Sequence, residues 1–376
     1  MVRLTFVGDI ALDKPLLRAA RERGNGTFDF SDVFHTQDVF EGSDLVIGNL
    51  ETCFGGGRLF NFKPYHYNSP DSFCDAVRAA GIGLVGTANN HSMDEGVRGL
   101  RRTLRRLDAC GIAHTGTFDA DTEDRFLVRE IGGLRIAFYS MTYSVNAGME
   151  SISCGDLYRH LNLTGFTGKK APKPVLFWKY FVQRKISQIR KKRRGQSTIS
   201  AHTDYFRTEW INSRWMEDIE RQLRRARERS DVLVVLLHSG GQFNVEPGDY
   251  SKAMTDRLLD LGADLVIGNH PYTVQRIEQR GEKLIAYSLG GYCMSVSGEY
   301  LVHDCLPEYS LALHADLSDD GKLAGWSFDV LKGTEDAGCY LNVRRAPDGD
   351  AGAAAISRRA GRAAGGGRAA AGNTRT

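Results

Sequence analysis

Short apolar runs alternate with longer amphipathic stretches along most of the chain. Residues 97–107 place apolar side chains three or four positions apart with arginines between them, which predicts an amphipathic helix that ends at Gly111. Residues 215–229 predict a similar helix. Alternation of short strands with such helices is typical of βαβ units, so the pattern predicts an α/β protein. Further strands are expected at residues 134–140, 284–288 and 309–313.

Polar residues follow closely after five of the apolar runs. In open α/β sheets the sites lie just outside the carboxyl ends of the strands. Two of the segments are nearly identical, SDLVIGN at 43–49 and ADLVIGN at 263–269, which suggests two related halves around one site. The runs are 4–7, 44–47, 82–85, 232–237 and 264–267, and the polar residues after them include Asp9, Asn49, Glu51, Asn90, His91, His238 and His270.

These seven residues combine carboxylates, amide oxygens and imidazoles. A pair of metal ions needs such a set, because one carboxylate bridges the ions, amides bind without adding charge, and imidazoles suit borderline metals. Any single one of the seven could equally be a cap or a turn former. Their recurrence at strand ends favours a metal site over seven independent caps.

The net charge of +3 conceals a strong segregation of charge along the chain. Residues 157–203 hold twelve Lys or Arg and no Asp or Glu, and residues 344–376 hold seven Arg against two Asp. Since these segments contribute +12 and +5, the rest of the chain carries −14.

Residues 344–376 are also rich in Ala and Gly. They are expected to form a disordered tail, because they bury too little apolar area to offset the entropy lost on ordering. The pattern therefore predicts one domain over residues 1–343 with a basic helical insertion at about 157–203.

Within the basic insertion, residues 175–194 predict a cationic amphipathic helix. Apolar side chains recur at 175, 178, 182, 186 and 189, and five consecutive basic residues follow. Such a helix can contact an anionic membrane or a membrane synthase, hold an anionic polymer or phosphoester substrate near the site, or pack as a lid on the body. Its aromatic residues also suit single-stranded nucleic acid, but no nucleic-acid module accompanies them, so that partner is not expected.

The apolar runs also bear on the compartment in which we expect the protein. The longest runs, such as 232–237, are far shorter than the roughly 20 residues that span a bilayer. The first residues lead directly into a strand pattern rather than a secretory signal. Seven cysteines are scattered without a CxxC pair, which is typical of reduced, structural cysteines. We therefore expect a cytoplasmic protein, free or bound peripherally at the inner face of the membrane.

Six motifs occur in order along the chain: FVGD (6–9), DLVIGNLE (44–51), ANNHSMD (88–94), LHSGGQFN (237–244), GADLVIGNHPY (262–272) and YSLG (287–290). They resemble those of the CapA, or PGA_cap, proteins of bacterial capsule and poly-γ-glutamate synthesis. The resemblance implies the calcineurin-like metallophosphoesterase fold, a four-layer αββα sandwich of two mixed sheets with flanking helices. It also implies a metal-dependent hydrolase or transferase that acts on an anionic ester or amide in capsule or exopolymer biosynthesis. The alternative is a non-catalytic assembly subunit whose degraded metal site binds polymer or a membrane synthase.

The resemblance also implies roles for individual residues. The implied metal ligands are Asp9 for one ion, Glu51 as a bridge, and Asn90, His238 and His270 for the other ion. His91 and Asp94 are the expected catalytic residues, with His91 either protonating a leaving oxygen or stabilising the transferring centre. The cofactor would be one or two divalent ions of Mn, Fe or Zn. The expected substrate contacts are Asn49, Tyr65, His66, Gln242 and Tyr272, although packing of the tyrosine-rich loop on the sheet edge is an equal alternative for residues 63–70.

The sequence departs from the family pattern at one expected ligand. Typical members continue Gly-x-His-Pro-His, but Tyr272 stands where the second histidine would be, so the ion bound by Asp9 loses a ligand. Ser239 and Gly291 also stand where many relatives have Trp and Asn. We therefore expect either a single metal ion or a weakly bound pair.

Overall fold

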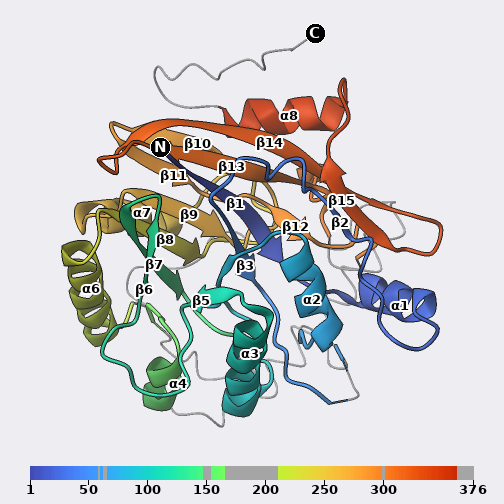
Figure 1. The fold of residues 1–376 in the computed structure, drawn as a ribbon, viewed down its shortest axis with the longest axis horizontal. Helices are drawn as coiled ribbons and strands as arrows, with labels where there is room; N and C mark the ends of the chain where they lie inside the picture. Colours follow the sequence, from blue (N-terminus) through green and yellow to red (C-terminus); the bar gives the residue numbers. More distant parts are fainter. Residues whose placement is uncertain (58–59, 62–65, 147–153, 166–210, 299–300, 362–376) are drawn as a thin grey trace, which may run out of the picture.

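The computed structural model describes residues 1–57, 60–61, 66–146, 154–165, 211–298 and 301–361. Two β-sheets pack against each other, with helices around them (Figure 1). The helices are α1 (Lys14–Arg23), α2 (Asp71–Ala79), α3 (Gly96–Cys110), α4 (Cys154–His160), α6 (Ser213–Glu228), α7 (Asp249–Asp260) and α8 (Ala351–Ala360), with a 3₁₀ helix at His303–Cys305. The strands are β1 (Val2–Ile10), β2 (Phe34–His35), β3 (Leu45–Leu50), β4 (Leu84–Gly86), β5 (Ala113–Thr115), β6 (Leu127–Ile131), β7 (Leu134–Thr142), β8 (Val232–His238), β9 (Leu265–Asn269), β10 (Ile277–Arg280), β11 (Lys283–Ala286), β12 (Gly291–Cys293), β13 (Tyr309–Leu317), β14 (Leu323–Glu335) and β15 (Leu341–Arg345).

Both sheets combine parallel and antiparallel strands. The first has the order β2-β15-β14-β13-β1-β3-β4-β5, with β12 paired to β1, and the second has the order β10-β11-β9-β8-β7-β6. The strands β1, β3, β4 and β5 are parallel, as are β7, β8, β9 and β11. Antiparallel strands β13, β14 and β15 extend the first sheet, and β6 and β10 form the antiparallel edges of the second. The sheets are therefore mixed, as the sequence predicted.

Three groups of buried apolar side chains fill the spaces between the layers. Side chains from both sheets, such as Phe6 of β1 and Phe138 of β7, meet in the group between the sheets. A second group joins the first sheet to α1 and α2, with Leu16 and Phe73 among its members. A third group joins the second sheet to α6 and α7. Hydrophobic packing therefore produces the expected four-layer αββα arrangement.

The local patterns in the sequence account for the helix boundaries. In α3 the predicted apolar stripe is buried, and the helix ends where Gly111 adopts the left-handed conformation with φ 68°. The second predicted helix is α6, which begins where the Asn212 side chain accepts a hydrogen bond from the Trp215 backbone N–H. The strands expected at 134–140, 284–288 and 309–313 are present as β7, β11 and β13, with β11 placed slightly earlier in the chain.

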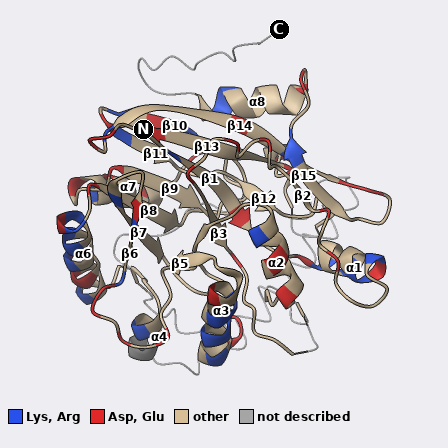
Figure 2. Ribbon diagram, viewed as in Figure 1, with Lys and Arg blue, Asp and Glu red and all other residues tan. Residues whose placement is uncertain are grey.

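Arginines are prominent on α3 and α6 (Figure 2). Several of them pair with carboxylates, such as Arg102 with Asp71 and Arg225 with Asp124. Pairs near the surface, such as these partly buried ones, add little to stability, typically about 0–1 kcal/mol each. Within the described part of the chain, no helix has both the length and the apolar content needed to cross a bilayer.

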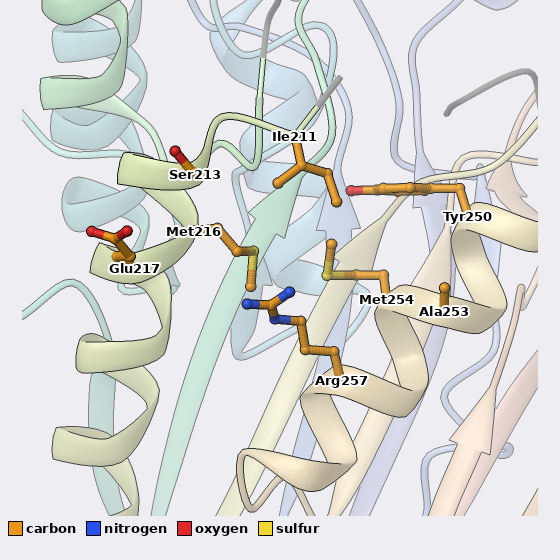
Figure 3. Close-up of a pocket in the computed structure, with 8 residues that line it drawn as sticks. All are labelled: Ile211, Ser213, Met216, Glu217, Tyr250, Ala253, Met254 and Arg257. Atoms are coloured by element: carbon orange, nitrogen blue, oxygen red, sulfur yellow. The ribbon is translucent and has the colours of Figure 1, made fainter. Parts of the chain in front are cut away.

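A groove lies between α6 and α7 in the outer helical layer (Figure 3). Met216 and Glu217 of α6 line one side, and Tyr250, Met254 and Arg257 of α7 line the other. None of the residues expected at the metal site lines this groove.

The C-terminal segment expected to be a disordered tail is partly ordered. The strand β15 continues to Arg345, and α8 follows at Ala351–Ala360. Ile356 is fully buried in the group between the sheets, and the Asp350 side chain caps α8 and accepts a hydrogen bond from Lys332. Buried Ile356 and Ala360, with a charge-assisted cap, thus order a segment that is otherwise poor in large apolar residues. Residues 362–376 and most of the basic insertion, including 175–194, lie outside the described residues.

Candidate metal centre

The ends of β1, β3, β8 and β9 bring polar residues of both sheets together. Asp9 is paired with Asn49 in the β1–β3 register, and His238 with Asn269 in the β8–β9 register. Two contacts join the sheets at this point. Asn49 Nδ2 lies 3.1 Å from His238 Nδ1, and the His270 backbone N–H donates to Asp9 Oδ2 at 2.9 Å. Residues far apart in the sequence therefore meet in one buried cluster.

Three potential ligand atoms of other residues lie close to His238 Nε2. His238 Nε2 lies 2.8 Å from Asn90 Oδ1, 3.0 Å from His270 Nδ1 and 3.6 Å from Glu51 Oε1. Ligand atoms of Glu51, His238 and His270 all lie within 4.8 Å of one another, and these residues are buried. Because imidazole, carboxylate and amide oxygen suit divalent transition metals, the donor set fits such an ion.

The surroundings of Glu51 support this fit. Its side chain is fully buried, and Oε1 accepts a hydrogen bond from the Tyr272 phenol, whereas Oε2 has no partner in the described structure. Burial, followed by the nearby Asp9 charge, raises the pKa of Glu51 well above its ordinary value. A buried oxygen without a partner is unfavourable, and a cation beside it would satisfy it and favour the ionised carboxylate.

Burial shifts the pKa values of Asp9 and His238 in opposite directions. It raises the pKa of Asp9 to about 7, against the lowering effect of hydrogen bonds from the His270 backbone and Asn49. Burial, with the neighbouring His270 and His91, lowers the pKa of His238 well below its ordinary value, so this imidazole is neutral and retains a lone pair for a metal. Asp9 differs from Glu51 because both of its oxygens accept hydrogen bonds from the protein.

The turn after β9 carries His270 and Tyr272 into the cluster. These residues have φ values of 102° and 55°, a left-handed conformation that costs of order 1–3 kcal/mol for a residue other than glycine. Tyr272, which replaces the expected histidine, directs its phenol to Glu51. Burial and the Glu51 charge raise the pKa of Tyr272 well above its ordinary value, so the phenol stays protonated and acts as a donor.

His91 and Asp94 form a hydrogen-bonded pair beside the cluster. His91 Nδ1 lies 2.6 Å from Asp94 Oδ2, and His91 Nε2 lies 3.9 Å from Glu51 Oε1. The Tyr67 ring stacks on the imidazole with centroids 4.2 Å apart, and its backbone N–H donates to Asp94 Oδ2 at 2.6 Å. A carboxylate on Nδ1 fixes the ring orientation and leaves Nε2 for proton transfer at the cluster.

Sequence reasoning missed two polar residues of the site, Tyr143 and Asn146. Tyr143 Oη lies 3.2 Å from His270 Nε2. Asn146 Nδ2 lies 3.2 Å from both ring nitrogens of His91, and Asn146 Oδ1 accepts a hydrogen bond from Asn90 Nδ2 at 3.0 Å. Both residues follow β7, a strand that the sequence predicted, so extending the strand-end rule to this strand would have found them.

The expected substrate contacts lie in different surroundings. Asn49 is buried, and its amide nitrogen donates to Asp9 Oδ1 at 2.7 Å, so it orients a candidate ligand. His66 Nε2 lies 2.6 Å from the Asp94 backbone oxygen, beside the His91–Asp94 pair. Gln242 is half-buried, Tyr272 contacts Glu51, and Tyr65 lies outside the described residues.

Comparison with known proteins identifies relatives of this chain. The family model for the bacterial capsule synthesis protein PGA_cap matches residues 3–295. The uncharacterized protein y4sH of Sinorhizobium fredii is 28% identical over 312 residues, which cover 77% of this chain and 65% of that protein, so the chain spans less than two thirds of this relative. The PGA biosynthesis protein CapA of Bacillus subtilis is 22% identical, with 82% of this chain and 67% of that protein covered. The capsule biosynthesis protein CapA of Bacillus anthracis is 21% identical, with 82% and 63% covered.

Two solved structures also align with the chain. A hypothetical protein from Thermus thermophilus aligns with a TM-score of 0.45 at 14% identity, covering 88% of this chain and 99% of that one. The 5'-nucleotidase precursor from the same organism aligns with a TM-score of 0.35 at 12% identity, covering 88% and 54%. The family model covers most of the sequence and confirms the family predicted from the motifs: the chain belongs to the bacterial capsule synthesis protein PGA_cap family.

Proposed function

We propose that this protein is a metal-dependent hydrolase or transferase that acts on an anionic ester or amide in the assembly of a capsule or related exopolymer. The observation that carries the proposal is the buried convergence of Glu51, Asn90, His238 and His270, with the His91–Asp94 pair beside it. Family membership and the capsule roles named for the CapA relatives support the biological setting.

Glu51, Asn90, His238 and His270 would hold one divalent ion, with Mn, Fe or Zn as candidates. When bound, the ion would supply a Lewis acid that polarises a phosphoryl or acyl oxygen of the substrate. A second ion would need Asp9, whose two oxygens already accept hydrogen bonds from protein donors. This difference between Asp9 and Glu51 supports one ion rather than a pair.

His91 would act as the general acid of the reaction. Asp94 accepts a hydrogen bond from His91 Nδ1 and fixes the orientation of the ring, so Nε2 is the atom that would give a proton to the leaving oxygen of the substrate. Tyr67 covers one face of the ring, and Asn146 contacts its nitrogens, which limits its rotation. Positioned proton transfer of this kind typically contributes about 10²- to 10⁴-fold in rate.

The partners that we propose follow from charge. The substrate class is anionic, because a divalent ion favours negative charge on the bound group. The basic segment 157–203 would contact an anionic polymer or an anionic membrane surface, and residues 175–194 contain its densest positive charge.

A non-catalytic assembly subunit is the second candidate function. One observation favours it: both oxygens of Asp9 and one oxygen of Glu51 are bonded to donors of the protein itself. In a subunit of this kind, such a closed network would stabilise the fold, and the protein would bind polymer or a membrane synthase without turning over a substrate.

Metal content and turnover separate the two functions. Protein purified without chelator would be assayed for bound metal and for hydrolysis of an aryl phosphodiester with added Mn²⁺. We expect one bound ion per chain and a turnover that His91→Asn removes while the ion is retained. The matched control is His314→Asn, a buried histidine bonded to Thr5 and Asp329, which should preserve both readouts. Wild-type protein with neither bound metal nor turnover would favour the assembly subunit.

A further inference from the structure

The C-terminal helix α8 lies beyond the residues matched by the family model, yet one of its side chains reaches the turn after β9. In the fold, α8 lies alongside β14 and close to β13 (Figure 1). Arg359 of this helix donates through Nη1 to Thr273 Oγ1 at 3.0 Å, to the Cys305 carbonyl at 2.9 Å and to the Val274 carbonyl at 3.4 Å. The guanidinium therefore joins α8 to two consecutive residues of the turn.

Thr273 and Arg359 share a hydrogen-bond acceptor. Its side chain is fully buried, and its hydroxyl donates to the Cys305 carbonyl at 2.7 Å, the same oxygen that Arg359 binds. Burial lowers the pKa of Arg359, which reflects the loss of water around the guanidinium. Charge-assisted hydrogen bonds in such surroundings are stronger than exposed ones, so the link is stiff as well as specific.

The link acts directly beside the strained part of the turn. His270 and Tyr272 both have positive φ, and backbone of this kind persists only where its surroundings over-determine it. On one side, contacts within the metal centre hold these two residues. On the other side, the next residue in the chain is Thr273, which Arg359 holds.

We propose that Arg359 is a positioning residue for the metal centre. By holding Thr273 and Val274 from α8, it keeps His270 and Tyr272 at the positions from which they reach the candidate ligand set. The consequence for metal affinity rests on the proposed function, whereas the effect on the order of the turn does not. The C-terminal segment outside the family match thus contributes to the site from a distance.

The test compares two arginines of the same helix in the full-length protein. Arg359→Met removes the guanidinium but keeps an unbranched side chain with good helix propensity. Arg358→Met is the matched control, because Arg358 is the exposed neighbour on α8. Backbone hydrogen exchange across residues 268–276 would be measured without metal, and the Kd for Mn²⁺ would be measured by calorimetry.

We expect Arg359→Met to accelerate exchange at 268–276 while the strands of both sheets keep wild-type protection. Mn²⁺ binding should weaken about 10-fold, the size typical of residues that support a metal ligand. Arg359→Lys, which retains a charged donor, should recover part of both effects, and Arg358→Met should alter neither.

Two results would overturn the proposal: wild-type exchange at 268–276 in Arg359→Met, or an equal loss of protection throughout the sheets, which would make α8 a general stabiliser. Wild-type protein that binds no Mn²⁺ would refute the proposed metal chemistry, and the exchange measurement would still decide the role of Arg359 in ordering the turn.

Discussion

Replacing Glu51 with glutamine is expected to stabilise the metal-free protein and to remove its response to metal. The Glu51 side chain is fully buried, Oε1 accepts from the Tyr272 phenol, and Oε2 has no partner in the described structure. The Glu51→Gln side chain has the same shape without the charge, and its amide oxygen can still accept the hydrogen bond from Tyr272. The substitution therefore separates the burial of a carboxyl group from the packing around it.

The raised pKa of Glu51 determines how the free energy of unfolding depends on pH. The folded state raises the pKa of Glu51 above the ordinary value of 4.5, so the folded protein keeps a proton that the unfolded chain releases. Its contribution to stability is complete below pH 4.5 and is lost as the pH rises toward the folded pKa, at about 1.4 kcal/mol per pH unit. Because the folded pKa lies well above 4.5, this loss grows as the pH rises from 4.5 to 7, and Glu51→Gln should recover it.

Urea unfolding in the presence of a chelator measures this difference at pH 4, 5.5 and 7. The variant should match the wild type in free energy of unfolding at pH 4 and exceed it by a growing margin at pH 5.5 and pH 7, at most about 1.4 kcal/mol for each pH unit above 4.5. Added Mn²⁺ at about 100 times its Kd should stabilise the wild type by about 2.7 kcal/mol and leave the variant unchanged. The reasoning would be refuted by a variant that is less stable than the wild type at pH 7 without metal. It would also be refuted by a variant that is stabilised equally at pH 4 and pH 7.

Asp350→Asn provides a control in which the effect of pH on stability should run in the opposite direction. Its hydrogen bond with Lys332, followed by that with Tyr309, lowers the pKa of Asp350. Because the pKa is lowered, the carboxylate stabilises the fold at pH values above its ordinary pKa of 3.8. This contribution is lost as the pH falls through the folded pKa. The variant should therefore be less stable than the wild type at pH 7, and the two should converge in acid.

Three further predictions concern the site and the C-terminal helix. His91→Asn should lower turnover of an aryl phosphodiester by about 10²- to 10⁴-fold in a steady-state assay, while the Kd for Mn²⁺ in calorimetry stays at the wild-type value; weaker Mn²⁺ binding would mean that His91 is a ligand. Tyr272→His should raise the number of Mn²⁺ ions bound per chain, measured by elemental analysis, if the missing histidine is what weakens the ion at Asp9; an unchanged number would exclude that geometry. Ile356→Ala should lower the free energy of unfolding by about 2–4 kcal/mol in urea, because it empties a buried position between the sheets; wild-type stability would show that α8 does not anchor the fold.

The residues after predicted strands indicated most of the candidate site because parallel strands place their carboxyl ends at one edge of a sheet. This reasoning identified Asp9, Glu51 and His238 from separate segments of the chain. It could not distinguish the two carboxylates, because Asp9 receives donors from β3 and from the turn after β9, whereas Glu51 keeps one oxygen without a partner. That distinction depends on how the two sheets meet.

Other features of the site had no clear local signal. Asn146 follows the predicted strand β7, but only the tertiary structure shows that it contacts both His91 and Asn90. Arg359 belongs to a segment whose Ala and Gly content predicted disorder. Its ordering depends on Ile356, which finds a buried position on strands distant in the sequence, and composition alone does not reveal such a position.

The sequence by itself determined the alternation of strands and helices, the polar strand ends and the family, because periodicity and motif order are local properties of the chain. Only the tertiary structure decided which ligand atoms converge, that Tyr272 directs its phenol to Glu51 across 221 positions of sequence, and that α8 joins the core. These outcomes depend on burial and on contacts between distant segments, where the removal of water changes the pKa of each group and the packing of one side chain can order a whole helix.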